Sequence, residues 1–119
     1  MITHPRTEEL VQAVAGWIDS VRPGLDPRNA FLARVAVNVL GVVGRELTQG
    51  PAAEAAAVER LSALLGHEGS FEALNAELCA ALQSGAMDAE TPGLLGALKA
   101  NALEQVAIDQ PNYAYEGRR

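Results

Sequence analysis

The chain has 119 residues, enough for one domain that buries a hydrophobic core without disulfides. Hydrophobic residues make up 49% and aromatic residues only 4%, because the apolar content comes mainly from 22 Ala, 15 Leu and 10 Val. The net charge of −6 and the few aromatic side chains argue against a nucleic-acid-binding protein, and a single Cys excludes an intrachain disulfide framework or a cysteine zinc site.

The first predicted helix runs from residue 5 or 7 to residue 21, where apolar residues recur every three or four positions and Pro23 and Gly24 follow. The second begins after Asp26, a favourable N-cap residue followed by Pro27, and continues to about residue 47. Gly50 is expected to end it. Since its apolar residues surround the helix, we expect it to be long, central and buried.

Three further helices are predicted, over residues 51–65, 70–82 and 91–108. Gly66 and Gly85 are expected to end the first two of these, and Ser70 to cap the second. Thr91 is expected to cap the last helix, which Pro111 prevents from continuing. Residues 112–119 are expected to form an irregular tail.

These elements predict an all-α fold: a single domain, residues 1–119, built as a bundle of about five mostly antiparallel helices. The short linkers favour antiparallel neighbours. Gly41 and Gly44 in the second helix and Gly93 and Gly96 in the fifth predict a close crossing of these helices, within one chain or across a dimer interface. The whole net charge lies in the acidic segment 54–90, which is either a docking surface or a source of solubility.

A polar stripe interrupts the second helix. Arg34, Asn38 and Arg45 are spaced by four and seven residues and so lie along one side of it. If this side is buried, Arg34 needs a partner, for which Asp109, Glu77 and Glu46 are candidates. The stripe is interpreted either as a structural clasp or solvated face, or as a site for an anion or carboxylate.

The end of the last helix carries a second unusual polar group. Asp109 is unfavourable at a helix C-terminus, so a cation is expected beside it, supplied by Arg34 or Arg45. The Tyr113 ring could then lie on the bundle. This segment either pins the tail or, with Tyr115, forms a surface for a ligand or partner.

No catalytic or metal-binding motif is present. His4 and His67 lie far apart in the sequence, and neither a phosphate-binding loop nor a dinucleotide-binding motif occurs, so no metal or cofactor is expected. Cys79 is expected to be a buried, inert thiol. The longest apolar run is too short to cross a bilayer and no secretory signal is evident, so we expect a cytoplasmic protein without membrane contact.

Four segments carry a resemblance to a known family: residues 31–38 (FLARVAVN), residues 45–53 (REL and GPAA), residues 74–79 (LNAELC) and residues 107–113 (AIDQPNY). Together they resemble an uncharacterised family of small bacterial helical proteins. Its members are encoded beside aminoglycoside-phosphotransferase-like kinases and acyl-CoA dehydrogenases. The resemblance implies a companion of such an enzyme and assigns no catalytic residue.

The predicted function is therefore that of a non-catalytic accessory protein for a phosphotransferase-like kinase or an acyl-CoA-processing enzyme. The alternative is a binder of an acyl or carboxylate ligand, or a weak enzyme, that uses Arg34, Asn38 and Asp109; a hollow of about 300 Å³ beside them would favour it. Homodimerisation is a further alternative. The candidate site residues share a polar or aromatic side chain in an apolar context: Arg34, Asn38, Arg45, Glu46, Asn75, Asp109 and Tyr113.

Overall fold

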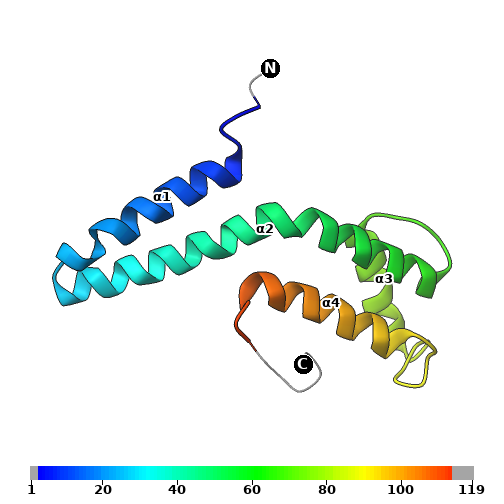
Figure 1. Ribbon diagram of the computed structural model, residues 1–119. Coiled ribbons are helices and arrows are strands. Elements are labelled where there is room, and N and C mark those ends of the chain that lie inside the picture. Colours follow the sequence, from blue (N-terminus) through cyan, green and yellow to red (C-terminus); the bar gives the residue numbers. More distant parts are fainter. Residues whose placement is uncertain (1–2, 114–119) are drawn as a thin grey trace. The chain divides into compact units, whose positions relative to one another are not determined.

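The computed structural model describes residues 3–113, and every regular element in that range is a helix. The elements in chain order are α1 (Thr7–Val21), a short 3₁₀ helix η1 (Arg22–Gly24), α2 (Pro27–Leu65), α3 (Phe71–Ser84) and α4 (Leu94–Asp109) (Figure 1). The all-α prediction is confirmed. The expected number of about five helices is wrong, because the described residues form four α-helices.

The chain divides into two compact units. Unit 1 contains the described residues up to Gly50 together with Ile108–Gln110, and unit 2 contains Pro51–Ala107 with the described residues from Pro111 onwards. Helices α2 and α4 each contribute to both units. The prediction of a single domain over residues 1–119 stays a prediction.

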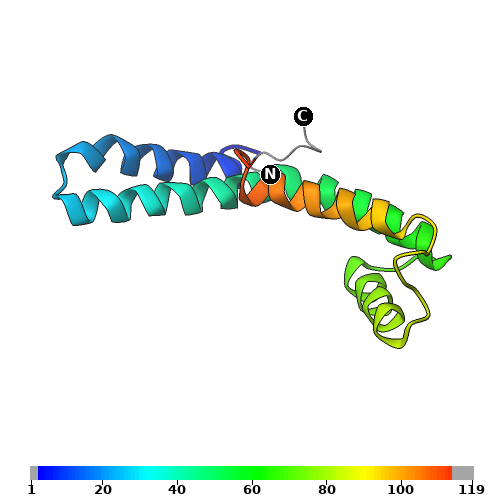
Figure 2. The same ribbon diagram turned by 90° about the horizontal axis from the view of Figure 1, so that it is seen from below.

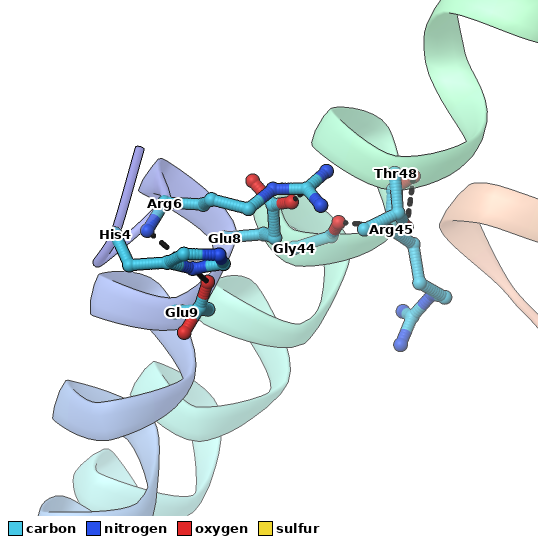
Figure 3. Close-up of polar contacts among 7 residues, drawn as sticks. All are labelled: His4, Arg6, Glu8, Glu9, Gly44, Arg45 and Thr48. Atoms are coloured by element: carbon cyan, nitrogen blue, oxygen red, sulfur yellow. Dashed lines mark hydrogen bonds and ion pairs between the residues drawn. The ribbon is translucent and has the colours of Figure 1, made fainter. Parts of the chain in front are cut away.

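Helix α1 has the predicted limits, and its first turn is held by acidic side chains. The Glu9 carboxylate accepts a hydrogen bond from the Arg6 backbone N–H, with an N–O distance of 3.2 Å, and it lies 2.9 Å from the His4 ring (Figure 3). Arg6 forms an ion pair with Glu8 at 2.6 Å. Carboxylates at this end of a helix satisfy exposed N–H groups and interact favourably with the helix dipole.

Asp26 caps α2 as its position before Pro27 predicts. Its carboxylate accepts hydrogen bonds from the Asn29 backbone N–H and from the Asn29 side-chain amide, each at 2.8 Å. These two donors, the backbone N–H first, lower the pKa of Asp26 below its ordinary value. The predicted start of the second helix is therefore confirmed, along with its cap.

The two helices predicted on either side of Gly50 are a single helix, because α2 runs without interruption from Pro27 to Leu65. Pro51 lies inside it and cannot donate the N–H that the Leu47 carbonyl would otherwise accept. Gly50 is absent from the glycines with positive φ, so it does not adopt the left-handed conformation that ends a helix. The good helix formers that follow Pro51 explain why the helix continues.

Two side chains in this part of α2, Thr48 and Glu46, lie against the helix's own backbone. The Thr48 hydroxyl donates to the carbonyl oxygens of Gly44 and Arg45, at 3.1 and 3.3 Å (Figure 3). A Cβ atom on Gly50 would lie 2.9 Å from Oε1 of Glu46, so the missing side chain leaves room for that carboxylate. Hydroxyl groups that bond back to a preceding turn commonly accompany bending in helices.

Helices α2 and α3 end as predicted at left-handed glycines. Gly66 follows α2 with φ of 82°, and Gly85 follows α3 with φ of 83°. Ser70 caps α3, since its hydroxyl oxygen accepts a hydrogen bond from the Ala73 N–H at 3.1 Å.

Removing the Ser70 cap should destabilise the protein. We expect Ser70→Ala to lower the free energy of unfolding by about 1 kcal/mol, because the Ala73 N–H loses its acceptor. Ser70→Asp keeps an acceptor at the cap and should leave stability within about 0.5 kcal/mol of the parent. Urea unfolding followed by circular dichroism measures both. Equal stability of all three proteins would contradict the cap.

Helix α4 begins later than predicted. Gly93 has a φ of 83°, so the residues before Leu94 form turns instead of the first helical turn. The Thr91 hydroxyl accepts from the Asp88 N–H at 3.0 Å, within the preceding loop. Thr91 therefore closes the loop and is not the side-chain cap of α4.

Unit 2 contains a defined hydrophobic core. Leu61 of α2, Leu74 and Leu78 of α3, and Leu94 of α4 form a buried cluster, with Leu61 and Leu74 completely inaccessible to solvent. Leu74 and Leu78 are four residues apart and so face the same side of α3. The centre of the core is thus formed by leucines, and Val58, Phe71 and Met87 are among the partly buried residues packed against it.

Unit 1 is packed differently. Helix α1 and the first part of α2 run side by side (Figures 1 and 2), and Ala33 is the buried residue of α2 in this pair. Many large apolar side chains remain exposed, including Phe31 at 63% and Val39 at 55%. The prediction that the second helix is buried on all sides is wrong, because α1 covers only one side of it.

The predicted close crossing at the helix glycines is not found within one chain. A Cβ atom on Gly41 would meet only the Arg45 side chain of its own helix, and one on Gly44 or Gly96 would meet nothing within 4 Å. A Cβ on Gly93 would contact Leu64 of α2 at 3.5 Å. Gly93 is therefore a turn residue packed against α2 within unit 2.

Candidate functional site

The predicted polar stripe of α2 lies at the surface. Arg34 and Asn38 are exposed, and the ion pairs recorded between residues 3 and 113 include none by Arg34. Among the interpretations of this stripe, the exposure of Arg34 agrees with a solvated face, since the buried position of this turn is Ala33 and the next residue is rotated about 100° around the helix. Glu46, one candidate partner, is exposed as well.

Arg45 is the member of the stripe with a structural contact. Its side chain is partly buried and extends from α2 away from Arg6 and Glu8 of α1 (Figure 3). Its Nε–H donates to the backbone carbonyl oxygen of Ile108 at 2.6 Å, within unit 1. This places a cation at the C-terminal end of α4, where the helix dipole favours positive charge. The predicted pairing of a cation with Asp109 itself stays a prediction.

The segment after α4 lies on the surface. Asp109 and Tyr113 are exposed and each makes an interaction. Tyr113 lines a shallow apolar hollow of about 250 Å³ together with Lys99, Ala102, Leu103 and Val106 of α4. Tyr113 therefore borders the helix that precedes it, α4, within unit 2. Tyr115 and the rest of the predicted irregular tail, residues 114–119, lie outside the described residues, while Pro111 and Asn112 form a turn.

Asn75 is exposed on α3, apart from the polar residues of unit 1. Glu77, proposed as a partner of Arg34, instead lies 2.6 Å from Nε2 of His67. Nδ1 of the same ring lies 3.0 Å from the Glu68 carbonyl oxygen. Both neighbours are acceptors, so the ring satisfies both only when both nitrogens carry protons. The Glu68 carbonyl first, and then Glu77, raise the pKa of His67 above its ordinary value.

The His67 contact gives a pH-dependent expectation. Its stabilising effect should be present at acid pH, where the ring is protonated in folded and unfolded chains, and should be lost as the pH rises through the raised folded-state pKa. Glu77→Gln should lower the His67 pKa, measured by NMR titration of its ring protons. Glu72→Gln, also on α3, should leave it unchanged. An unaltered His67 titration in Glu77→Gln would contradict the contact.

Unit 2 contains a polar cluster that the sequence interpretation missed. Arg60 of α2 donates to Asn101 of α4 at 2.7 Å and forms an ion pair with Glu104 of the same helix. The side chains of Arg60 and Glu104 are about two-thirds buried. Asn101 and Glu104 are three residues apart and so share a face of α4. The available signal was the single Arg of the acidic segment, together with Asn101 and Glu104 at a spacing of three residues in the last predicted helix.

A hollow of about 430 Å³ lies beside Arg60. Its other lining residues are small or apolar: Ala63, Leu64, Pro92, Gly93, Gly96, Ala97 and Ala100. Its one charged residue, Arg60, is already bound to Asn101 and Glu104. Neither this hollow nor the one at Tyr113 is lined by Arg34, Asn38 or Asp109, so the alternative of a ligand site there gains no support.

Cys79 is exposed, which corrects the expectation of a buried thiol. The core positions of α3 are Leu74 and Leu78. Cys79 follows Leu78 directly and is turned about 100° away from it around the helix. Its apolar neighbours in the sequence are therefore not its neighbours in the fold.

No three His, Cys, Asp or Glu side chains among the described residues, 3–113, come together in a group that could hold a metal ion. No helix in this range combines the length and the apolar character needed to span a membrane.

Unit 1 exposes many large apolar side chains on both of its helices. Helix α1 exposes a row formed by Leu10, Val14 and Trp17, here called the α1 row, whose Trp17 is 66% exposed. Helix α2 exposes Phe31, Leu32, Val35, Val39, Val43 and Leu47. Scattered exposed apolar residues are ordinary on a soluble protein, whereas contiguous rows of them mark interaction surfaces.

Comparison with known proteins identifies one family. The sequence profile described as "Domain of unknown function (DUF6285)" matches residues 23–113, which include all of α2, α3 and α4. No curated protein and no solved structure shows significant similarity to the chain.

Proposed function

The chain belongs to the DUF6285 family of unknown function, and we propose that it acts as a non-catalytic accessory protein that binds another protein through the α1 row. The observation that carries the proposal is the exposure of Leu10, Val14 and Trp17 on one side of α1. These residues are spaced by four and three positions, so they form a continuous stripe.

The composition of the α1 row is suited to a protein partner. Trp is among the residues that contribute most to binding when they enter a pocket of the partner. The nearby charged groups are already neutralised within α1 and its flanks, since Arg6 pairs with Glu8 and Arg22 pairs with Asp19. The row therefore offers apolar area without a charge that burial would leave unpaired.

The resemblance to bacterial proteins encoded beside phosphotransferase-like kinases and acyl-CoA dehydrogenases supports a particular class of partner. We propose the kinase-like protein first and the dehydrogenase second. In this proposal the chain works in the cytoplasm and needs no cofactor of its own.

Trp17 provides a direct test, because it is the only Trp of the chain. Purified protein is titrated with the neighbouring kinase-like protein and, separately, with the neighbouring dehydrogenase, and the complex is measured by calorimetry. Binding through the α1 row should give micromolar or tighter affinity. A 5-fluorotryptophan label at Trp17 should show a changed ¹⁹F signal on binding.

Two substitutions separate the α1 row from the rest of the surface. Trp17→Ala should weaken binding by at least about tenfold, as expected for a central interface anchor. Leu95→Ala, at an exposed position of α4, should leave binding unchanged. The proposal is wrong if neither protein binds at micromolar concentration, or if Trp17→Ala binds as tightly as the parent.

A further inference from the structure

A second row of side chains, on α2, has an unusual order. Its members alternate in spacing between four and three residues: Arg28, Leu32, Val35, Val39, Val42 and Glu46, here called the α2 row. This spacing places all six along one line of the helix and is the pattern of a helix that packs against another helix. Five of the six are exposed, and Val42 is partly buried.

The order of side-chain types in the α2 row is symmetric about its midpoint: apolar residues are matched with apolar residues, and the two ends carry opposite charges. Arg28 and Glu46 are equally far from its midpoint, as are Leu32 and Val42, and Val35 and Val39. If a second α2 helix lies antiparallel against the first, each apolar residue therefore faces an apolar residue. Each Arg28 then faces the Glu46 of the other copy, and symmetry makes this ion pair twice.

Within one chain, Arg28 and Glu46 cannot form an ion pair with each other. Arg28 and Glu46 are separated by 18 residues of continuous helix, which corresponds to about 27 Å. Neither takes part in the ion pairs recorded for the described part of the chain. The Glu46 carboxylate lies over Gly50 along its own helix, where it is exposed and free to turn.

We propose that the occupant of the α2 row is a second copy of this chain, bound antiparallel through a twofold axis midway between Arg28 and Glu46. Phe31 and Val43 flank the α2 row on its two sides, and both are exposed in the single chain. The dimer uses α2 and leaves the α1 row as a separate surface, so it does not depend on the accessory function proposed above.

A parallel arrangement is disfavoured by the same charges. It would place Arg28 against Arg28 and Glu46 against Glu46, which is unfavourable at both ends. In the antiparallel register, by contrast, opposite charges face each other and apolar residues face apolar residues.

The test exchanges the two charges. Arg28→Glu and Glu46→Arg each replace both attractive pairs of the dimer by repulsive ones, so each should raise the dimer dissociation constant about tenfold or more. The double variant Arg28→Glu/Glu46→Arg should return to the affinity of the parent. Sedimentation velocity and light scattering measure the mass against the 12.5 kDa of one chain.

Mixing the two single variants gives the sharpest readout. One chain then carries two Glu residues in the row and the other carries two Arg residues, so the mixed dimer has both attractive pairs. We expect the mixture to form heterodimers more tightly than either variant forms homodimers. Different affinity tags on the two variants allow the heterodimer to be isolated and counted.

A matched pair of variants controls for folding. Val39→Asp, at the exposed centre of the row, should abolish the dimer with unchanged helicity, whereas Leu95→Asp, equally exposed on α4, should leave it intact. A parent protein that stays monomeric at 100 μM concentration overturns the proposal. So do single charge variants that dimerise as well as the parent, which would mean that another surface or orientation joins the copies.

Discussion

Replacing Leu61 by alanine should lower the free energy of unfolding by about 2–5 kcal/mol. Leu61 is completely buried between Leu74 and Leu78 of α3 and Leu94 of α4, so the truncation leaves a cavity as well as removing apolar contacts. The size of the effect follows from its central position in the only buried cluster described for unit 2. Urea denaturation monitored by circular dichroism measures it.

Leu95→Ala is the matched control for Leu61→Ala. Leu95 is the neighbour of a core residue in sequence but is 60% exposed. The same change of side chain there should alter stability by no more than about 0.5 kcal/mol. Similar losses in the two variants would contradict the core, because they would show that burial does not distinguish the two positions.

Replacing Pro51 by alanine should have the opposite effect and raise the free energy of unfolding by about 1–3 kcal/mol. Pro51 lies in the interior of α2, where it removes one backbone hydrogen bond and crowds the carbonyl of Leu47. Alanine restores the donor. The gain is reduced because proline also restricts the unfolded chain.

Pro27→Ala tests whether this gain depends on position. Pro27 is the first residue of α2, where a proline has no hydrogen bond to lose, so the substitution should change stability little. Chemical denaturation of both variants gives the comparison. If Pro51→Ala leaves stability unchanged, residues 49–51 form a linker, as the sequence predicts, instead of the continuous helix.

Helix ends were predictable where the determinants are local. Asp26 before Pro27, Ser70 before an apolar run, and a glycine after residue 65 each act through the backbone of the next few residues. The same local reasoning was misleading at Gly50 and Pro51. These residues commonly end helices, but here Gly50 keeps a non-left-handed conformation and the flanking residues favour the helix enough to carry it through.

Burial was harder to predict than secondary structure. The apolar residues around α2 indicate a helix that needs covering, but they do not say whether its own chain or another molecule covers it. Cys79 was misplaced for this reason, since it was assigned the burial of its apolar neighbours in sequence. The Arg60 cluster was missed because its partners lie about 40 residues away on another helix.

Among the candidate polar residues, one contact was anticipated in part from the sequence. A cation was expected near the end of the last helix, and Arg45 supplies it through the Ile108 carbonyl. The remaining members of the predicted site, among them Asn38, Glu46 and Asn75, are exposed and lie on different parts of the fold. Their common feature was a polar side chain in an apolar sequence, which does not specify proximity.

The exposure of Cys79 affects how the protein is handled in the laboratory. As the only thiol of the chain, and an accessible one, it accepts a fluorescent dye or spin label at a single known position on α3. The same accessibility allows air oxidation to join two chains covalently. Samples stored without reductant should therefore acquire a disulfide-linked species on non-reducing gels, which Cys79→Ser removes, and which has no bearing on association through α2.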